Sequence, residues 1–167
     1  MKQACCIGLI LLLQACSSSE PDNSISASKP NERSVYSKKE ENIITFLNSE
    51  YETSVWASLV ELSTWADSIE KNEYTLLVPS DAVLRNKGLD KYQALVPSAN
   101  RAALNQEIGH HLIPGRISFA NLPDTVLKNV NGESLIYISS SKRLAEFEIT
   151  AVERDLKLGR VVRVRTN

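Results

Sequence analysis

The chain has 167 residues, of which 43% are hydrophobic and 23% are charged, and its formal net charge is −1. This length accommodates one domain after processing rather than two, and the composition excludes a wholly disordered or fibrous protein. Because the net charge is close to zero, no global field attracts nucleic acid, and we expect no nucleic-acid partner.

The first fifteen residues predict a lipoprotein signal peptide. An apolar run at residues 5–13 follows Lys2 and is too short to span a bilayer, which takes roughly 20 apolar residues. The sequence Leu-Gln-Ala-Cys at residues 13–16 resembles the bacterial lipobox, in which the cysteine thiol receives diacylglycerol. Cys16 is therefore the expected site of lipid attachment. The alternative is an ordinary signal peptide in which Cys16 is incidental.

The residues after the lipobox predict a place in the cell envelope. Ser17, Ser18 and Ser19 resemble the start of lipoproteins that are sorted to the outer membrane of Gram-negative bacteria. We therefore expect a membrane partner, contacted through acyl chains such as palmitate on the N-terminal lipid. Residues 16–37 are rich in serine and poor in large apolar side chains, which predicts a flexible tether before a folded domain at residues 38–167.

Short helices are predicted at several points of the domain. Residues 38–48 predict a helix with Glu40 and Glu41 in its first turn, where the helix dipole favours acidic side chains. Periodicity and the glycine or proline that ends each segment predict three further helices, at residues 82–86, 89–96 and 100–112.

The strongest helical pattern covers residues 52–70. Its apolar positions are spaced by four and three residues, which places them on one face of a helix. Trp56 and Trp65 border this face, and we expect them to be partly buried. The residues of the predicted face are Val55, Leu59, Leu62, Ala66 and Ile69.

Residues 74–84 combine the signals of a buried strand and of a helix start. Residues 74–77 have high strand propensity, and Pro79 is expected to end the strand because proline has no N–H for the ladder. Ser80 and Asp81 then suit the N-cap of a helix. The pair also resembles a catalytic arrangement, but the helix start explains both residues without chemistry.

Beyond residue 115 the period of the hydrophobic residues changes from about 3.6 to about 2, which predicts strands. Leu158, Val162 and Val164 are expected to share one face of the last strand. The predicted strands are residues 125–130, 133–139, 144–152 and 158–165, with turns at residues 131–132, 140–142 and 155–157. An order of helices, one strand, helices and then antiparallel strands favours an α+β fold over a doubly wound sheet.

Two blocks of the domain resemble the fasciclin-like domain family. They are Thr-Leu-Leu-Val-Pro-Ser-Asp at residues 75–81 and His-His-Leu-Ile-Pro-Gly at residues 110–115. The resemblance implies a wedge-shaped β-sandwich with helices along one edge. It also implies mainly structural roles for the motif positions, which are Thr75, Pro79, Ser80, Asp81, His110, His111, Pro114 and Gly115. His110 departs from the family, which usually has tyrosine there.

The two adjacent histidines are candidates for a metal or proton-transfer site. Neighbouring side chains on a helix diverge by about 100°, so His110 and His111 cannot chelate one ion. All three cysteines lie in the first sixteen residues, so the domain has no thiol ligand. We therefore expect no metal and no cofactor, and we expect His111 to pack in the core with a ring nitrogen hydrogen-bonded to the backbone.

Five cations near the C-terminus form a local charge asymmetry: Arg154, Lys157, Arg160, Arg163 and Arg165. One interpretation is a solvated face that also protects an edge strand. The alternative is an interaction surface for an anionic polysaccharide or a lipid headgroup.

The sequence contains none of the common hydrolase, nucleotide-binding or metalloprotease motifs, and the family that it resembles is mostly non-catalytic, so we expect no enzyme activity. The leading hypothesis is a membrane-anchored lipoprotein of the cell envelope whose domain binds protein or glycan partners in adhesion. The alternatives are a structural or accessory lipoprotein of an outer-membrane assembly and, less favoured, an uncharacterised hydrolase.

Overall fold

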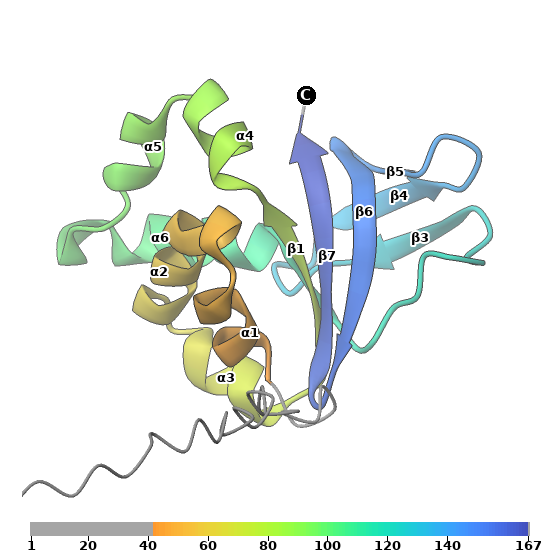
Figure 1. Ribbon diagram of the computed structural model, residues 1–167, viewed down its shortest axis with the longest axis horizontal. Helices are drawn as coiled ribbons and strands as arrows, with labels where there is room; N and C mark the ends of the chain where they lie inside the picture. The colour runs from red at the N-terminus through yellow and green to blue at the C-terminus, as the bar shows by residue number, and fades with distance from the viewer. Residues whose placement is uncertain (1–41, 167) are drawn as a thin grey trace, which may run out of the picture. The chain divides into compact units, whose positions relative to one another are not determined.

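The computed structural model describes residues 42–166, which form a helical part and a β-sheet (Figure 1). The α-helices and the 3-10 helices, labelled η, are α1 (Ile43–Ser49), η1 (Tyr51–Thr53), α2 (Ser54–Leu62), α3 (Ala66–Lys71), α4 (Asp81–Asn86), α5 (Leu89–Gln93), η2 (Ser98–Asn100) and α6 (Arg101–His110). The strands are β1 (Tyr74–Pro79), β2 (Leu112–Pro114), β3 (Thr125–Lys128), β4 (Ser134–Ile138), β5 (Arg143–Leu144), β6 (Phe147–Leu156) and β7 (Gly159–Thr166). The expected signal peptide, Cys16 and the tether lie outside the described residues.

The strands of residues 42–166 belong to one sheet with the order β2-β1-β7-β6-β5-β4-β3. Neighbouring strands are antiparallel except β1 and β7, which run parallel with Leu76 beside Val161. The helices lie against one side of β1 and β7, and β3, β4 and β5 lie on the other (Figure 1). The predicted α+β class is confirmed, although the sequence pattern did not reveal the parallel pair.

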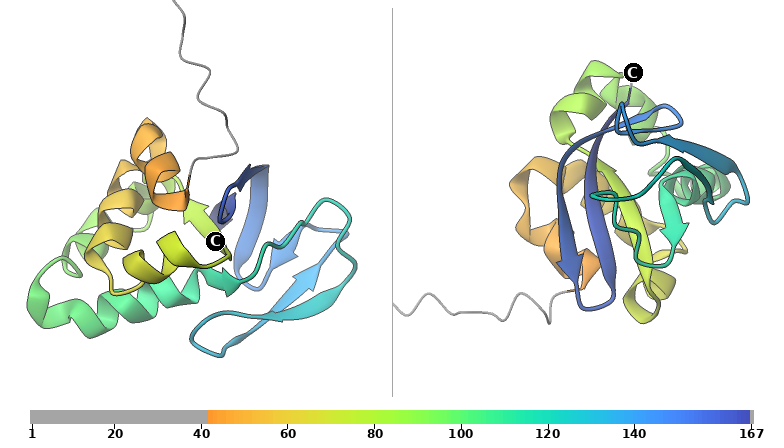
Figure 2. Two further views of the ribbon diagram at one scale, coloured as in Figure 1. Left: turned by 90° about the horizontal axis from the view of Figure 1, so that it is seen from below. Right: turned by 90° about the vertical axis from the view of Figure 1, so that its right-hand side faces the viewer.

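The sheet folds over on itself (Figure 2). Buried side chains of its distant strands form a hydrophobic core of their own. Leu77 of β1 packs in one buried cluster with Tyr137 of β4 and Leu144 of β5, although these strands are far apart in the strand order. The register shifts within β6 between Ile149 and Arg154. Such bulges bend a strand and increase its twist, which allows the sheet to curl. The predicted sandwich is therefore made from a single folded sheet.

Strand β1 is buried on both faces. Leu76 and Val78 pack with Trp56 and Leu104 in the core on the helix side, whereas Leu77 belongs to the core inside the folded sheet. A strand that lies between two cores needs no polar face. For this reason β1 has a continuous apolar sequence instead of an alternating one.

Strand β7 also contributes side chains to both cores. Val161 belongs to the helix-side core, and Val162 and Val164 belong to the core inside the sheet. The predicted shared face of Val162 and Val164 is confirmed. Leu158 does not join them, because it lies in the turn before the strand.

The C-terminal hairpin has a different turn from the predicted one. Strand β6 continues to Leu156, which pairs with Gly159, and Asp155 pairs with Arg160. The turn therefore consists of residues 157–158 and not of residues 155–157. The Asp155 carboxylate lies 3.4 Å from the Arg160 guanidinium, which favours this register.

The strand predicted at residues 144–152 is interrupted by a turn. Strand β5 ends at Leu144, Ala145 and Glu146 form the turn, and β6 begins at Phe147. Neither turn residue is one of the usual turn formers, which are glycine, proline, asparagine, aspartate and serine. The sequence therefore carried no signal for this turn.

The helix predicted over residues 52–70 is in fact two α-helices, α2 and α3, with a break at Ser63. Ser63 has an extended backbone with ψ of 161°, and its hydroxyl donates to the Val60 carbonyl oxygen at 2.7 Å. The Thr64 N–H donates to the side-chain oxygen of Asn105 in α6 at 2.9 Å. These side-chain contacts compete with the helical hydrogen bonds and end α2.

The break also changes which side chains are buried. Trp56 is completely buried, and the expectation of partial burial holds only for Trp65. Val60, which lies outside the predicted apolar face, is buried, whereas Leu62 of that face is exposed.

Among residues 42–166, no helix has the length and apolar character needed to cross a membrane.

Helix α1 begins later than predicted. It starts at Ile43, and the Asn42 side chain accepts a hydrogen bond from the Thr45 N–H at 2.8 Å as the N-cap. The first turn of α1 contains no acidic side chain, and Glu40 and Glu41, which were predicted there, lie outside the described residues.

Strand β2 was missed by the sequence analysis. Helix α6 ends at His110 instead of residue 112, because Leu112 begins a strand that pairs antiparallel with β1. Three residues are too few to show a period of two. The short helices predicted at residues 82–86 and 89–96 correspond to α4 and α5.

Candidate binding groove

The junction between β1 and α4 is a structural joint. The Ser80 hydroxyl accepts from the Val83 N–H at 3.4 Å, so Ser80 is the N-cap of α4. Asp81 is buried and does not cap its own helix. Its carboxylate accepts from the Ser54 hydroxyl at 2.7 Å and from the Val55 N–H at 3.2 Å. Asp81 thus caps the start of α2 and ties α4 to it.

Thr75, Pro114 and Gly115 organise the backbone beside β1. The Thr75 hydroxyl donates to the Gly115 carbonyl oxygen and accepts from the Ile117 N–H, both at 2.8 Å. Gly115 has φ of 86° and donates its N–H to the Glu73 carbonyl oxygen at 2.9 Å. Pro114 is the last residue of β2. These contacts hold the chain after β2 against β1.

His111 lies in the core, as predicted. Its Nδ1 donates to the Leu77 carbonyl oxygen at 2.9 Å, and its ring packs against Trp56 and Phe147 with centroid distances of 4.4 and 4.7 Å. Burial lowers the pKa of His111 to about 3. The ring is therefore neutral at pH 7 and serves packing and hydrogen bonding.

His110 contacts different partners from His111, as predicted for neighbouring residues of a helix. It is partly exposed, and its two ring nitrogens contact the carboxylates of Glu133 and Glu146. The centroids of the two histidine rings are 5.8 Å apart. Among the side chains that the structure describes, no group of three histidine, cysteine, aspartate or glutamate residues has the arrangement of a metal site.

The five cations near the C-terminus do not form one surface. Side chains alternate along β7, so Arg163 and Arg165 lie on its helix-facing side and Arg160 lies on the other. The Arg160 guanidinium donates to the Ile117 carbonyl oxygen at 3.3 Å, and Lys157 lies in the hairpin turn. Strands β6 and β7 are inner strands of the sheet. The interpretation that these cations protect an edge strand is therefore wrong.

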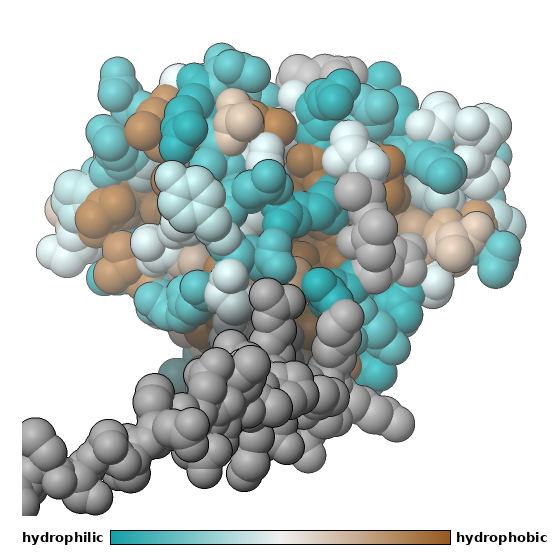
Figure 3. Space-filling model, viewed as in Figure 1, coloured by the Kyte–Doolittle hydropathy of each residue, from teal (hydrophilic) through white to brown (hydrophobic). Residues whose placement is uncertain are grey.

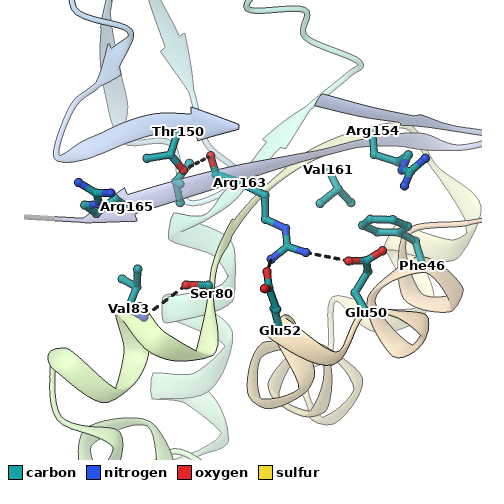
Figure 4. A pocket seen from close by; sticks show the side chains of 11 residues that line it. Phe46, Glu50, Glu52, Ser80, Val83, Thr150, Arg154, Val161, Arg163 and Arg165 are labelled. Atoms are coloured by element: carbon teal, nitrogen blue, oxygen red, sulfur yellow. Dashed lines mark hydrogen bonds and ion pairs between the residues drawn. The ribbon is translucent and has the colours of Figure 1, made fainter. Parts of the chain in front are cut away.

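A groove of about 550 Å³ lies between the helix-facing side of β7 and the helices α1 and α4 (Figure 4). Hydrophobic side chains reach the surface between the helices and β7, among hydrophilic ones (Figure 3). The groove is lined by three arginines, two glutamates and several apolar side chains, among them Arg154, Arg163, Arg165, Glu50, Glu52 and Phe46. Three of the five cations near the C-terminus therefore line one groove.

Arg163 crosses the groove from β7 to the end of α1 (Figure 4). Its Nη2 lies 2.9 Å from Glu50 Oε2, and its Nη1 lies 3.4 Å from Glu52 Oε2. The Arg163 side chain is 18% exposed, whereas that of Glu52 is 76% exposed. Arg163 therefore connects the sheet to the helices through a short ion pair with Glu50 and a longer one with Glu52.

The other two arginines retain unused hydrogen-bond donors. The Arg154 guanidinium lies over the Phe46 ring at 5.3 Å, and no carboxylate among the described side chains lies within ion-pair distance of it. Arg165 is 62% exposed, and its Nη1 is 3.9 Å from Glu148 Oε2, at the limit of an ion pair. Both guanidinium groups are therefore able to bind an anionic ligand.

A smaller hollow of about 190 Å³ adjoins the groove and shares Glu52 and Ser80 with it. Tyr51 and Arg85 also line this hollow. Tyr51 as a whole residue is 89% exposed, although tyrosine has a large apolar ring. The exposed ring extends the candidate contact surface beyond the arginines.

The acidic side of the groove was missed by the sequence analysis. Glu50 and Glu52 are 113 and 111 residues away from Arg163 in the chain, so only the fold brings them together. Phe46 lies within the helix predicted at residues 38–48, and that pattern carried no sign of a groove. Two glutamates on either side of Tyr51, directly after a predicted helix, were the available signal.

The sequence profile of the fasciclin domain matches residues 51–158. The chain belongs to the fasciclin domain family. Its fold is similar to that of the FAS1 domain pair from the insect cell adhesion molecule Fasciclin I, with a TM-score of 0.60 and 12% sequence identity. The similarity covers 77% of this chain and 50% of that chain, so the chain spans about half the length of its structural relative. No curated protein matches the sequence.

The fasciclin domain is known from cell adhesion, and the solved FAS1 domain pair comes from a cell adhesion molecule. The matched residues include the β1–α4 junction, both histidines and Arg154, but they end before β7. Arg163 and Arg165 of the groove are therefore outside the match. A structural similarity at 12% identity shows the fold alone, so the groove has to be interpreted from its own residues.

Proposed function

We propose that this fasciclin domain protein is a lipid-anchored lipoprotein of the cell envelope that binds an anionic protein or glycan chain in adhesion. The observation that carries the proposal is the groove with unused guanidinium donors on Arg154 and Arg165. Its three arginines and two glutamates leave one net positive charge, although the whole chain has a net charge of −1. Arginine binds carboxylate, sulfate and phosphate groups with charge-assisted hydrogen bonds.

The spacing of the two arginines favours an extended ligand. Arg154 faces Val161 across the β6–β7 hairpin, and Arg165 is four residues further along β7. At a rise of about 3.4 Å per residue, the two arginine backbones are about 14 Å apart. A ligand with a single anionic group contacts one guanidinium, whereas a chain with repeated anionic groups contacts both.

The first test is whether the protein binds an anionic chain. The full protein in detergent is mixed with poly-L-glutamate or with a polyuronate, and binding is measured. We expect binding that weakens as salt is added, because screening reduces the attraction between exposed charges. The double variant Arg154→Gln/Arg165→Gln should bind about tenfold more weakly or worse, since each charged hydrogen bond contributes roughly 1 kcal/mol or more. Fluorescence anisotropy measures both effects.

Arg101→Gln is the matched control for the loss of an arginine, because Arg101 begins α6 and does not line the groove. This variant should bind as the unaltered protein does. The proposal fails if neither polymer binds, or if the double variant binds them equally well. The polymer that binds more tightly indicates whether the natural partner is an acidic protein segment or an acidic glycan.

The membrane anchor is the second point to test. Acyl chains on Cys16 are expected to hold the protein in the membrane, since each buried methylene contributes about 0.8 kcal/mol. The tether predicted at residues 16–37, with about 20 residues, would as a flexible chain have a root-mean-square reach of about 25 Å, enough to hold the domain clear of the lipid headgroups.

Cys16→Ser should move the protein from the membrane fraction to the soluble fraction, as measured by fractionation and by mass spectrometry of the N-terminal lipid. Cys6→Ser is the control, because Cys6 lies within the predicted signal peptide and its loss should leave the protein in the membrane. A Cys16→Ser protein that remains with the membrane would contradict the anchor.

A further inference from the structure

His110 joins three separate segments of the fold. It is the last residue of α6, Glu133 lies between β3 and β4, and Glu146 belongs to the turn between β5 and β6. His110 Nδ1 is 2.6 Å from Glu133 Oε2, and His110 Nε2 contacts Glu146 Oε1. Each ring nitrogen therefore faces a carboxylate oxygen from a different hairpin.

This arrangement is complete only when the His110 ring is protonated. Carboxylate oxygens accept hydrogen bonds, and a neutral imidazole has a single N–H to donate. The imidazolium has two N–H groups and satisfies both carboxylates. After the loss of one proton, one ring nitrogen presents a lone pair to a carboxylate oxygen, and that contact becomes repulsive.

The two carboxylates are not held equally. Glu133 also accepts from Asn129 Nδ2 at 2.5 Å, and its N–H donates to Asn129 Oδ1 at 2.9 Å. Asn129 is buried, which gives Glu133 a fixed position. Among the described residues, no second side chain supports the Glu146 carboxylate. Glu146 is therefore the partner that separates from His110 first.

The backbone next to Glu146 is strained. Ala145 has φ of 51°, in the left-handed region that glycine adopts easily and alanine does not. Such a conformation persists when surrounding contacts hold it. The contact between Glu146 and His110 is one of these, so its loss favours a change in the turn.

The charged groups that face His110 come from two of the three segments. They are the carboxylates of Glu133 and Glu146, while His111 of α6 is neutral and Phe147 of β6 is apolar. Burial lowers the pKa of His110, but the hydrogen bonds and charges of the two glutamates outweigh it and raise the pKa above 6.5. Hydrogen bonds from Asn129 and His110 lower the pKa of Glu133.

We propose that His110 is a pH-sensitive latch, which holds the β5–β6 turn against the end of α6 while its ring is protonated and releases the turn when the ring is neutral. The Asn129–Glu133 contacts keep the β3–β4 connection in place in both states. The latch is independent of the groove and of the anionic partner.

The pH dependence of the latch follows from the raised pKa of His110 and the lowered pKa of Glu133. The raised pKa of His110 means that its contribution is complete below pH 6.5 and is lost as the pH rises through the folded-state pKa. The lowered pKa of Glu133 means that its contribution is complete above pH 4.5 and is lost as the pH falls through its folded-state pKa. In the folded protein the latch is therefore closed between the lowered pKa of Glu133 and the raised pKa of His110, and it opens as the pH rises through the pKa of His110.

NMR of the isotope-labelled full chain in detergent, titrated from pH 5 to pH 9, tests the latch. We expect the His110 ring signals to titrate with a midpoint above 6.5 and the amide signals of Ala145 and Glu146 to change with the same midpoint. Amide signals of Asn129 should change much less. His110→Gln should abolish the pH response of the turn, because glutamine has no titratable proton in this range.

Glu146→Gln should lower the His110 midpoint by about 0.5 pH units or more, since an adjacent carboxylate favours the protonated ring. Glu148→Gln removes the same charge two residues away, where the carboxylate lies beside Arg165, and should leave the His110 midpoint and the turn unchanged. The proposal is overturned if the turn signals do not follow His110, if the His110 midpoint is 6.5 or lower, or if Glu148→Gln has the same effect as Glu146→Gln.

Discussion

Replacing Gly159 with alanine is expected to lower the free energy of unfolding by about 3 kcal/mol or more. Gly159 begins β7 with φ of 124°, a conformation that alanine rarely adopts. An added Cβ would overlap the carbonyl oxygen of Tyr74 and lie 2.7 Å from Ile43 Cδ1. Because the Tyr74 oxygen belongs to the backbone of β1, it cannot move aside without disturbing the pairing of β1 with β7.

Gly132→Ala provides the matched control. Gly132 also has a positive φ, of 84°, but nothing lies within 4 Å of an added Cβ there. The free energy of unfolding of the control should therefore fall by only about 1 kcal/mol, the cost of the backbone conformation. Urea unfolding of both variants at one pH measures the difference. Equal losses at the two positions would show that the close approach of β1 to Gly159 is unimportant for stability.

Lowering the pH from 7 to 4 is expected to destabilise the fold by about 3 kcal/mol through His111. Burial holds the pKa of His111 at about 3 in the folded protein, against an ordinary value of 6.5. Between these values the unfolded chain binds a proton at this ring and the folded protein does not. Stability therefore falls as the pH falls from 6.5 toward 3.

The variant His111→Gln isolates this effect, because glutamine keeps a hydrogen-bond donor but does not titrate. The variant should be less stable at pH 7, since it loses the ring contacts with Trp56 and Phe147. Its stability should then fall by about 3 kcal/mol less than that of the unaltered protein between pH 7 and pH 4. Denaturant unfolding at several pH values gives both curves. Parallel curves would mean that other groups cause the acid sensitivity.

Part of the site was predictable because helix geometry is local. The spacing of residues in α6 indicated that His111 faces the core and that His110 points elsewhere, and the structure confirms both directions. The same spacing failed for residues 52–70. The break at Ser63 depends on Asn105, which is 41 residues from Thr64 and contributes nothing to a local pattern.

The charged residues show even more clearly that a local sequence pattern does not reveal contacts between distant segments. The five cations are close in the sequence, but alternation along β7 and the hairpin turn place them on different sides of the sheet. Asp81 was expected to cap the helix that it begins, but its carboxylate caps α2 because the fold brings Ser54 and Val55 close to it. Local propensity identifies a residue that suits a cap but not the helix end that it reaches.

Three features were predictable from the sequence alone, because each depends on residues that are neighbours in the chain. They are the strand-to-helix junction at residues 74–84, the buried His111 and the fasciclin resemblance. The three-dimensional structure was needed to find the parallel pairing of β1 with β7, the groove and the contacts of His110 with two glutamates. Each of these depends on contacts between distant segments, such as Arg163 with Glu50 over 113 residues. Periodicity reports which side of an element is buried, and the packing of the elements decides which side chains meet.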